Sequence, residues 1–212
     1  MKPRAAIGVG LFLLYVTILI VLGQVGGVDY DAAWDSTHNV LTGILPALVV
    51  GGGLIGFIAW RIGWWSWAIR DRHRVRAWWM LVPAALALVA VIANFAATDW
   101  GEVTLDFFLA TLVLGVAVGF AEEFVCRGVL LVGLRGTFQE VGAWALSCLL
   151  FGLMHIVNIF LGAPVGGTVG QIISAAMAGS TFYLLRRYYG LLIPAMVLHG
   201  LGDMSIFVQE FS

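Results

Sequence analysis

Three short polar clusters interrupt the apolar stretches in the second half of this chain. The first contains Glu122, Glu123 and Arg127, the second ends at His155, and the third pairs His199 with Asp203. Ionisable groups at bilayer depth are costly, and they usually face a protein interior or a water-filled cavity. The three clusters are therefore the candidate functional site of this sequence.

The first cluster divides into two parts on geometric grounds. Glu122 and Glu123 are neighbours, so on a helix they point about 100° apart and cannot face one pocket equally. Glu123 and Arg127 stand at i and i+4 with the acid first, which is the favourable order for an ion pair. We expect Glu123 and Arg127 to form a buried pair that fixes the helix, which leaves Glu122 free for acid–base work.

The two histidine clusters complete a set that can hydrolyse an amide without a covalent intermediate. A carboxylate and a histidine can hold and deprotonate a water molecule. A second histidine with an acidic partner at i+4 can stabilise a developing oxyanion. His155 should share a helical face with Phe151 and Asn158. The predicted catalytic residues are Glu122, His155, His199 and Asp203, and the predicted supporting residues are Glu123, Arg127 and Asn158.

Other chemistries fit the sequence less well. Glu122, His155 and His199 would form a plausible zinc set, but the chain lacks His-Glu-x-x-His, so we expect no cofactor and keep zinc as the alternative. No Gly-x-Ser-x-Gly motif indicates a serine nucleophile. A non-enzymatic membrane protein is the rival hypothesis, either an immunity-type binder or a proton or solute pathway. A transporter would be expected to contain inverted repeats, and the two halves of the chain do not match.

The composition is that of an integral membrane protein. Hydrophobic residues make up 61% of the chain and charged residues 11%, whereas soluble domains have about 25% charged residues. The formal net charge of −1 argues against a nucleic-acid-binding protein, for which a basic surface would be expected. Cys126 and Cys148 lie inside apolar runs, so we expect them to pack as small hydrophobic groups rather than form a disulfide.

The apolar runs predict an all-α, polytopic transmembrane helix bundle. A helix needs about 20 apolar residues to cross the hydrocarbon. We expect the first run to be a retained span rather than a signal peptide. Seven candidate spans satisfy the length rule: 5–23, 40–60, 77–97, 105–134, 143–161, 169–187 and 190–208. The predicted organisation is three N-terminal spans in residues 1–104 and a catalytic core in residues 105–208.

The charges between the spans predict an orientation in the cell membrane. With the N-terminus in the cytoplasm, every loop lysine and arginine falls inside and the acidic loops fall outside, as the positive-inside rule requires. Seven spans then place the C-terminus outside. The longest basic loop, between Trp60 and Trp79, alternates tryptophan with arginine. It is either an interfacial belt with orientation charges or an amphipathic surface helix that lies near anionic lipid.

The three clusters together resemble the CPBP family, also called the CAAX protease and bacteriocin-processing or Abi family. Its pattern is Glu-Glu-x-x-x-Arg, then Phe-x-x-x-His, then His-x-x-x-Asn or Asp. The matching segments are EEFVCR at 122–127, FGLMH at 151–155 and HGLGD at 199–203, and YGLLIPAMVLH at 189–199 is similar to the family's approach to its last histidine. The resemblance covers about residues 105–205.

The family comprises glutamate-dependent intramembrane proteases, among them CAAX prenyl protease 2. The resemblance implies that Glu122 is a general base assisted by His155, and that His199 and Asp203 stabilise the oxyanion. An ionised Asp203 would repel an oxyanion, so it must be protonated or must orient His199. The implied partners are membrane lipid and a membrane-anchored protein or peptide substrate, with no nucleic acid. Small residues could close helix contacts within one chain or between chains; they are Gly115, Gly119, Ala175 and Gly179.

Overall fold

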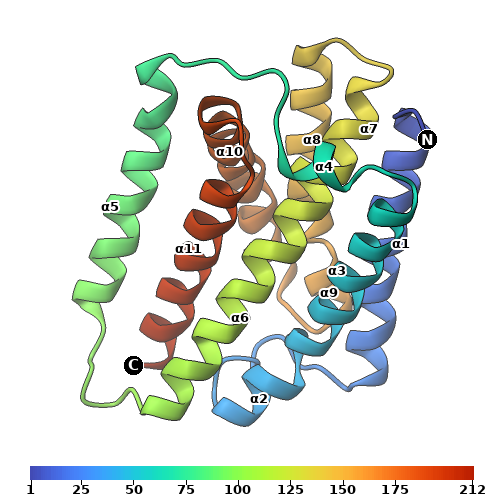
Figure 1. The fold of residues 1–212 in the computed structure, drawn as a ribbon. Helices are drawn as coiled ribbons and strands as arrows, with labels where there is room; N and C mark the ends of the chain where they lie inside the picture. The colour runs from blue at the N-terminus through green and yellow to red at the C-terminus, as the bar shows by residue number, and fades with distance from the viewer.

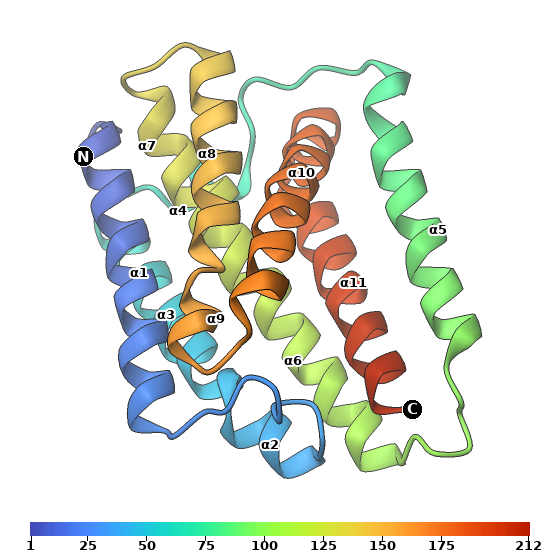
Figure 2. The same ribbon diagram turned by 180° about the vertical axis from the view of Figure 1, so that it is seen from behind.

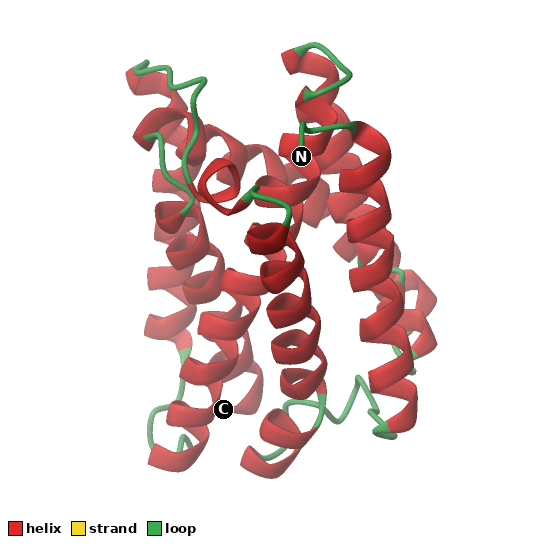
Figure 3. Ribbon diagram, turned by 45° about the vertical axis from the view of Figure 1, so that its right-hand side comes forward, coloured by secondary structure: helices red, strands yellow, loops and turns green.

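The computed structural model describes all 212 residues and consists of helices without a β-strand (Figures 1 and 3). A 3₁₀ turn, Trp78–Leu81, precedes α5, and a π-helical segment, Phe124–Leu130, joins α6 to α7. The helices are α1 (Ala5–Val25), α2 (Thr37–Thr42), α3 (Ile44–Arg61), α4 (Trp65–Ile69), α5 (Val82–Ala97), α6 (Leu105–Glu123), α7 (Leu131–Arg135), α8 (Glu140–Met154), α9 (Val157–Phe160), α10 (Val165–Tyr189) and α11 (Ile193–Phe211). The predicted all-α class is confirmed.

Six of the predicted crossings are helical segments long and apolar enough to span a membrane. They are Ala5–Val25, Thr37–Arg61, Trp78–Ala97, Leu105–Arg135, Glu140–Phe160 and Val165–Tyr189. The protein is therefore a multi-pass membrane protein. The seventh predicted span corresponds to α11, which has 19 residues but carries polar groups and is not among the six. Figure 1 places the two termini at opposite ends of the bundle, and this arrangement fits an odd number of crossings.

Two of the predicted spans are not single, regular α-helices. The fourth continues without a break from Leu105 to Arg135, but the segment after Glu123 widens into a π-helix. Such segments occur frequently at functional sites. The fifth is interrupted, because α8 ends at Met154 and α9 begins at Val157. The prediction of one continuous helix over 143–161 was therefore wrong at His155, where the backbone turns.

Basic and acidic loops gather at opposite ends of the bundle. The N-terminal amino group donates to the carbonyl oxygen of Ile62 at 2.8 Å, and Trp64 Nε1 donates to that of Met1 at 2.8 Å. The N-terminus therefore lies beside the arginine-rich loop, and Figure 2 shows the α7–α8 connection at the same end. The other end carries the acidic residues Asp29, Asp31, Asp35, Asp99, Glu102, Asp106 and Glu210, and no lysine or arginine.

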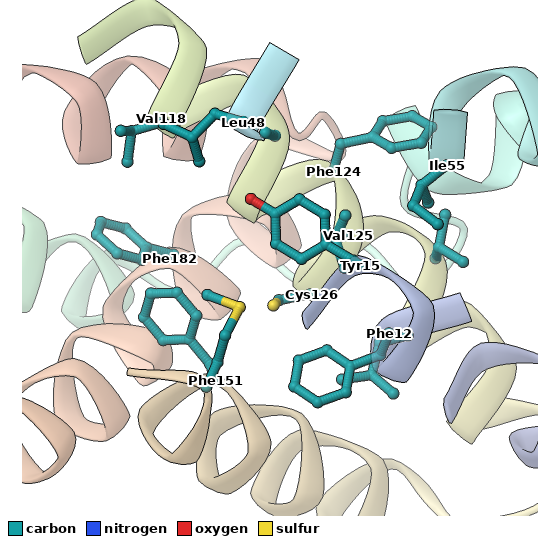
Figure 4. Close-up of a cluster of buried hydrophobic side chains, with 14 of the residues drawn as sticks. Phe12, Tyr15, Leu48, Ile55, Val118, Phe124, Val125, Cys126, Phe151 and Phe182 are labelled. Carbon is teal, nitrogen blue, oxygen red and sulfur yellow. The ribbon is translucent and has the colours of Figure 1, made fainter. Parts of the chain in front are cut away.

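One hydrophobic core of 34 buried residues includes side chains from both halves of the chain. Figure 4 shows Tyr15 of α1 beside Cys126 of the π-helical segment, with Phe151 and Phe182 close by. Close approach of α6 and α11 depends on glycine: a Cβ on Gly115 would lie 2.7 Å from a carbonyl oxygen of α11. A Cβ on Gly119 or Gly179 would also come closer than 3.0 Å to neighbouring atoms, and Ala175 belongs to the core, so these four small residues pack within one chain. Both cysteines are free and buried, as expected.

Candidate active site

Glu123 connects three elements of the predicted site. It is the last residue of α6, its side chain is fully buried, and its Oε1 accepts a 2.8 Å hydrogen bond from Arg127 Nη1. The same oxygen lies 3.0 Å from Nδ1 of His199 on α11. The i, i+4 spacing predicted the pair with Arg127. The contact with His199 depends on the packing of α11 against α6 and was not expected.

Phe151 provides the surface on which the charged groups pack. The guanidinium carbon of Arg127 lies 3.8 Å from the centroid of the Phe151 ring and 5.3 Å from the centroid of the Phe182 ring. This is a favourable cation–π arrangement for a buried arginine. The ring also meets His155 and His199 edge-on, with centroids 5.2 and 5.6 Å apart. The phenylalanine of the Phe-x-x-x-His pattern therefore positions an arginine and two histidines.

Three carboxyl groups surround His199. Its Nδ1 faces Glu123, while its Nε2 lies 3.8 Å from Oε2 of Glu122 and 3.6 Å from Oδ2 of Asp203. The last two distances exceed those of hydrogen bonds, so Nε2 is close to both carboxyl groups but bonded to neither. The imidazole also stacks on Phe182, with centroids 4.7 Å apart and planes inclined by 16°. Stacking and the bond to Glu123 fix the ring and leave Nε2 directed at Glu122 and Asp203.

His155 is oriented by the end of α8. Its Nδ1 lies 3.0 Å from the carbonyl oxygen of Phe151. A carbonyl can only accept, so Nδ1 carries the proton and Nε2 of the neutral ring keeps a free lone pair. Asn158 lies on α9 rather than on the same helix, and its Nδ2 donates to Gln171 Oε1 at 2.7 Å. The prediction that Phe151, His155 and Asn158 share one helical face was therefore wrong.

A cavity of about 340 Å³, here called the polar cavity, joins the site to the acidic end of the bundle. Glu122, His155, Asn158 and Asp203 all line it. Its rim includes Tyr30 and Trp34 of the α1–α2 loop, Pro164 before α10 and Glu210 near the C-terminus. These rim segments lie toward the lower end of the bundle in Figure 2. Water from that end can therefore reach Glu122 without crossing the core.

A second cavity of about 330 Å³, the lateral cavity, approaches the same residues from the side. His155, His199 and Asp203 line its inner part. Its outer part is formed largely by alanine and other apolar residues of α5, α10 and α11, with Val91 and Leu198 among them. Figure 1 shows α5 at the margin of the bundle, beside α11. The catalytic candidates thus lie between a polar opening and an apolar one.

Sequence reasoning missed Gln171 and Tyr30. Gln171 lines both cavities, and its Nε2 donates to the Tyr30 hydroxyl at 3.1 Å. Burial raises the pKa of Tyr30 to about 12, so the phenol remains protonated at neutral pH. A glutamine inside a predicted span was a visible signal for the first residue. Nothing in the local sequence around Tyr30 indicated that the α1–α2 loop would fold over the site.

The geometry does not group the zinc alternative's residues into a metal site. No set of three or more His, Cys, Asp or Glu side chains is placed to hold a metal ion. Oε2 of Glu122 lies 3.8 Å from Nε2 of His199, whereas His155 lines the polar cavity at the C-terminal end of α8. The four predicted catalytic residues converge around the two cavities, and the Glu123–Arg127 pair lies beneath them.

The second half of the chain matches a known protein family. Residues 104–205 match a family model described as Rce1-like, type II CAAX prenyl endopeptidase Rce1-like. The matched segment, slightly less than half of the chain, is similar to that family. The match confirms the resemblance to CAAX proteases that the three motifs indicated. No curated protein and no solved structure matches the chain.

The Rce1-like region begins at Thr104, the N-cap of α6, and ends within α11. All seven predicted site residues lie inside it. The family is a peptidase family, and the first two of the three polar clusters lie in segments long and apolar enough to span a membrane. The first hundred residues lie outside the match, yet Tyr30, Ile44 and Leu48 from that part line the polar cavity. The unmatched helices therefore help to form the wall of the site.

Proposed function

We propose that the protein is an intramembrane endopeptidase that hydrolyses a peptide bond of a membrane-associated protein or peptide. The observation that carries this proposal is the convergence of Glu122, His155 and Asp203 on one polar cavity, with His199 between the carboxyl groups. Each cluster comes from a different helix, and the match of residues 104–205 to the Rce1-like peptidase family supports the same reaction class.

In this mechanism Glu122 is the general base. Its side chain is 13% exposed, which gives it contact with cavity water, and no hydrogen-bond partner in the protein occupies its carboxylate. A water molecule held between Glu122 and the free Nε2 of His155 attacks the peptide carbonyl carbon. Its proton passes to Glu122, and the same proton then goes to the departing amine nitrogen as the C–N bond breaks.

His199 stabilises the oxyanion in this mechanism. Its Nδ1 is occupied by Glu123, so donation to the oxyanion must come from Nε2, and this requires both ring nitrogens to be protonated. The carboxylate of Glu123, 3.0 Å away, favours the charged imidazolium. Asp203, 3.6 Å from Nε2, keeps the ring directed into the cavity. The imidazolium then meets the charge that develops in the transition state.

The proposed orientation puts the basic end and the N-terminus in the cytoplasm and the C-terminus outside the cell membrane. The polar cavity then opens to the outside, at an end that carries acidic residues and no lysine or arginine. We expect the extramembrane flank of the substrate to be neutral or basic, because like charges would be repelled. The apolar part of the substrate would reach the site through the lateral cavity beside α5.

The test compares peptide fragments in membranes of cells that carry wild type or Glu122→Gln at matched expression. Removing a general base should lower the cleavage rate by at least about two decades. New peptide termini that depend on Glu122 would support the proposal and identify the substrate. Identical fragment profiles from two folded, inserted proteins would refute it and would favour the immunity-type binder or the proton or solute pathway.

A further inference from the structure

We propose that a pocket at the basic end of the bundle binds the phosphate of an anionic glycerophospholipid headgroup. This basic pocket has a volume of about 260 Å³ and is lined by Trp67, Arg70, Arg72, His73 and Arg135, together with residues 3, 132 and 136. No acidic residue lines it. It lies at the end opposite the polar cavity, and the proposal does not depend on peptidase activity.

Two of the lining arginines have no acidic partner. Arg70 and Arg72 are exposed and take part in none of the protein's salt bridges. Arg135, in contrast, is engaged by Asp71 and Glu140, with Nη2–oxygen distances of 3.2 and 2.6 Å. The pocket therefore contains two guanidinium groups whose donors are free for an anion. A guanidinium fork matches the oxygen spacing of a phosphate.

The loop that carries these arginines is held in place before any ligand binds. Its backbone is bonded to the α10–α11 connection: Asp71 N donates to Gly190 O at 3.0 Å, and Leu192 N donates to Ile69 O at 2.9 Å. The guanidinium carbon of Arg72 lies 5.2 Å from the centroid of the Trp67 ring. Because the loop and one arginine are already ordered, phosphate binding costs less conformational entropy.

The surroundings of the pocket favour a lipid over a free phosphate. Trp65, Trp78 and Trp79 are 41%, 78% and 55% exposed near the same end of the bundle. Exposed tryptophans of a membrane protein concentrate at the level of the lipid headgroups. A phosphate at that depth belongs to a phospholipid whose acyl chains lie along the apolar helix surfaces. In this proposal, the alternating arginines and tryptophans of the loop bind one specific ligand, a phospholipid headgroup.

The test measures lipid binding to the purified protein by native mass spectrometry in detergent, where no charged bilayer surface is present. Phosphatidylglycerol, phosphatidylcholine and inorganic phosphate are titrated separately. We expect wild type to bind phosphatidylglycerol at least about tenfold more tightly than either alternative. In Arg70→Gln/Arg72→Gln the phosphatidylglycerol affinity should fall roughly 10- to 30-fold, since each arginine near a headgroup contributes about one kcal/mol.

The matched control is Arg61→Gln/Arg76→Gln, which removes two exposed arginines from the same end but outside the pocket. It should change the affinity by less than about threefold if the pocket, rather than overall charge, binds the lipid. Equal losses in both double variants would overturn the proposal, and so would unchanged binding in Arg70→Gln/Arg72→Gln. Phosphate binding as tightly as phosphatidylglycerol would show a free-anion site and overturn the lipid assignment.

A second measurement does not depend on the folding of any variant. A photoreactive phosphatidylglycerol is crosslinked to wild-type protein, and the labelled peptides are identified. We expect labels in the segments 67–73 and 132–136, which contain seven of the eight residues that line the basic pocket. Labels confined to other segments would contradict the proposal even if the variants were misfolded.

Discussion

The two adjacent glutamates should differ in what they contribute to stability, and this difference can be measured. In Glu123→Gln the fully buried Arg127 loses its only carboxylate partner. Removing one member of a buried ion pair costs about 3–5 kcal/mol, because the other charge stays uncompensated. The glutamine oxygen can still accept from Arg127 and His199, so we expect a loss of about 3 kcal/mol in the free energy of unfolding. For a chain of this size that corresponds to roughly 6–12 °C in melting temperature.

Glu122→Gln is the matched comparison. The Glu122 side chain lines the polar cavity, and its nearest charged neighbour, His199, is 3.8 Å away. We therefore expect it to lower the free energy of unfolding by less than about 1 kcal/mol. The thermal unfolding of both variants is measured by circular dichroism in the same detergent. Cleavage should be lost in Glu122→Gln although its stability is nearly unchanged.

A double-mutant cycle separates the ion pair from general disturbance of the helix. Arg127→Met removes the buried charge, so Glu123→Gln/Arg127→Met should be more stable than the sum of the single effects predicts, by at least about 1 kcal/mol. Additive losses would mean that Glu123 and Arg127 do not stabilise each other. If Glu122→Gln destabilised the protein as much as Glu123→Gln, the division between a structural and a chemical glutamate would be refuted.

Substitutions on α10 and at Asp203, cysteine labelling of two loops and a chelator give further predictions. Gly179→Ala should lower the free energy of unfolding by about 1–3 kcal/mol, since its Cβ would lie 2.5 Å from a guanidinium nitrogen of the buried arginine; Gly170→Ala on the same helix meets nothing within 4 Å and should be neutral in the same melt. Asp203→Asn should keep cleavage within about tenfold of wild type, and Asp203→Leu should lose at least about a hundredfold, because an amide can still orient the histidine. Single cysteines introduced in loop 29–35 should react with an impermeant maleimide in intact cells, and those in loop 72–76 only after permeabilisation. The two native cysteines are buried and should not react. The reverse labelling pattern would show that the proposed orientation is inverted. Dialysis against a chelator should leave cleavage unchanged, and loss of activity restored by zinc would favour the zinc alternative.

The sequence alone was sufficient for the class of the protein and for the identity of its candidate site. Composition and run length determine membrane spans, because no polar backbone or charge is tolerated in hydrocarbon without compensation. The same cost makes Glu122, His155 and Asp203 conspicuous in apolar runs. The local i, i+4 rule predicted the pair of Glu123 with Arg127, which the structure confirms at 2.8 Å. These inferences depend only on neighbours along one helix.

Contacts between helices required the tertiary structure. The bond from His199 to Glu123, the break of the helix at His155 and the closure of the α1–α2 loop over Gln171 join residues far apart in the chain. No local periodicity encodes them, because they depend on how glycine-lined helices approach and on which loops meet at one end of the bundle. The i, i+4 rule predicted which glutamate pairs with Arg127, but only the packing shows that the other, Glu122, lines the polar cavity beside Asp203 of α11.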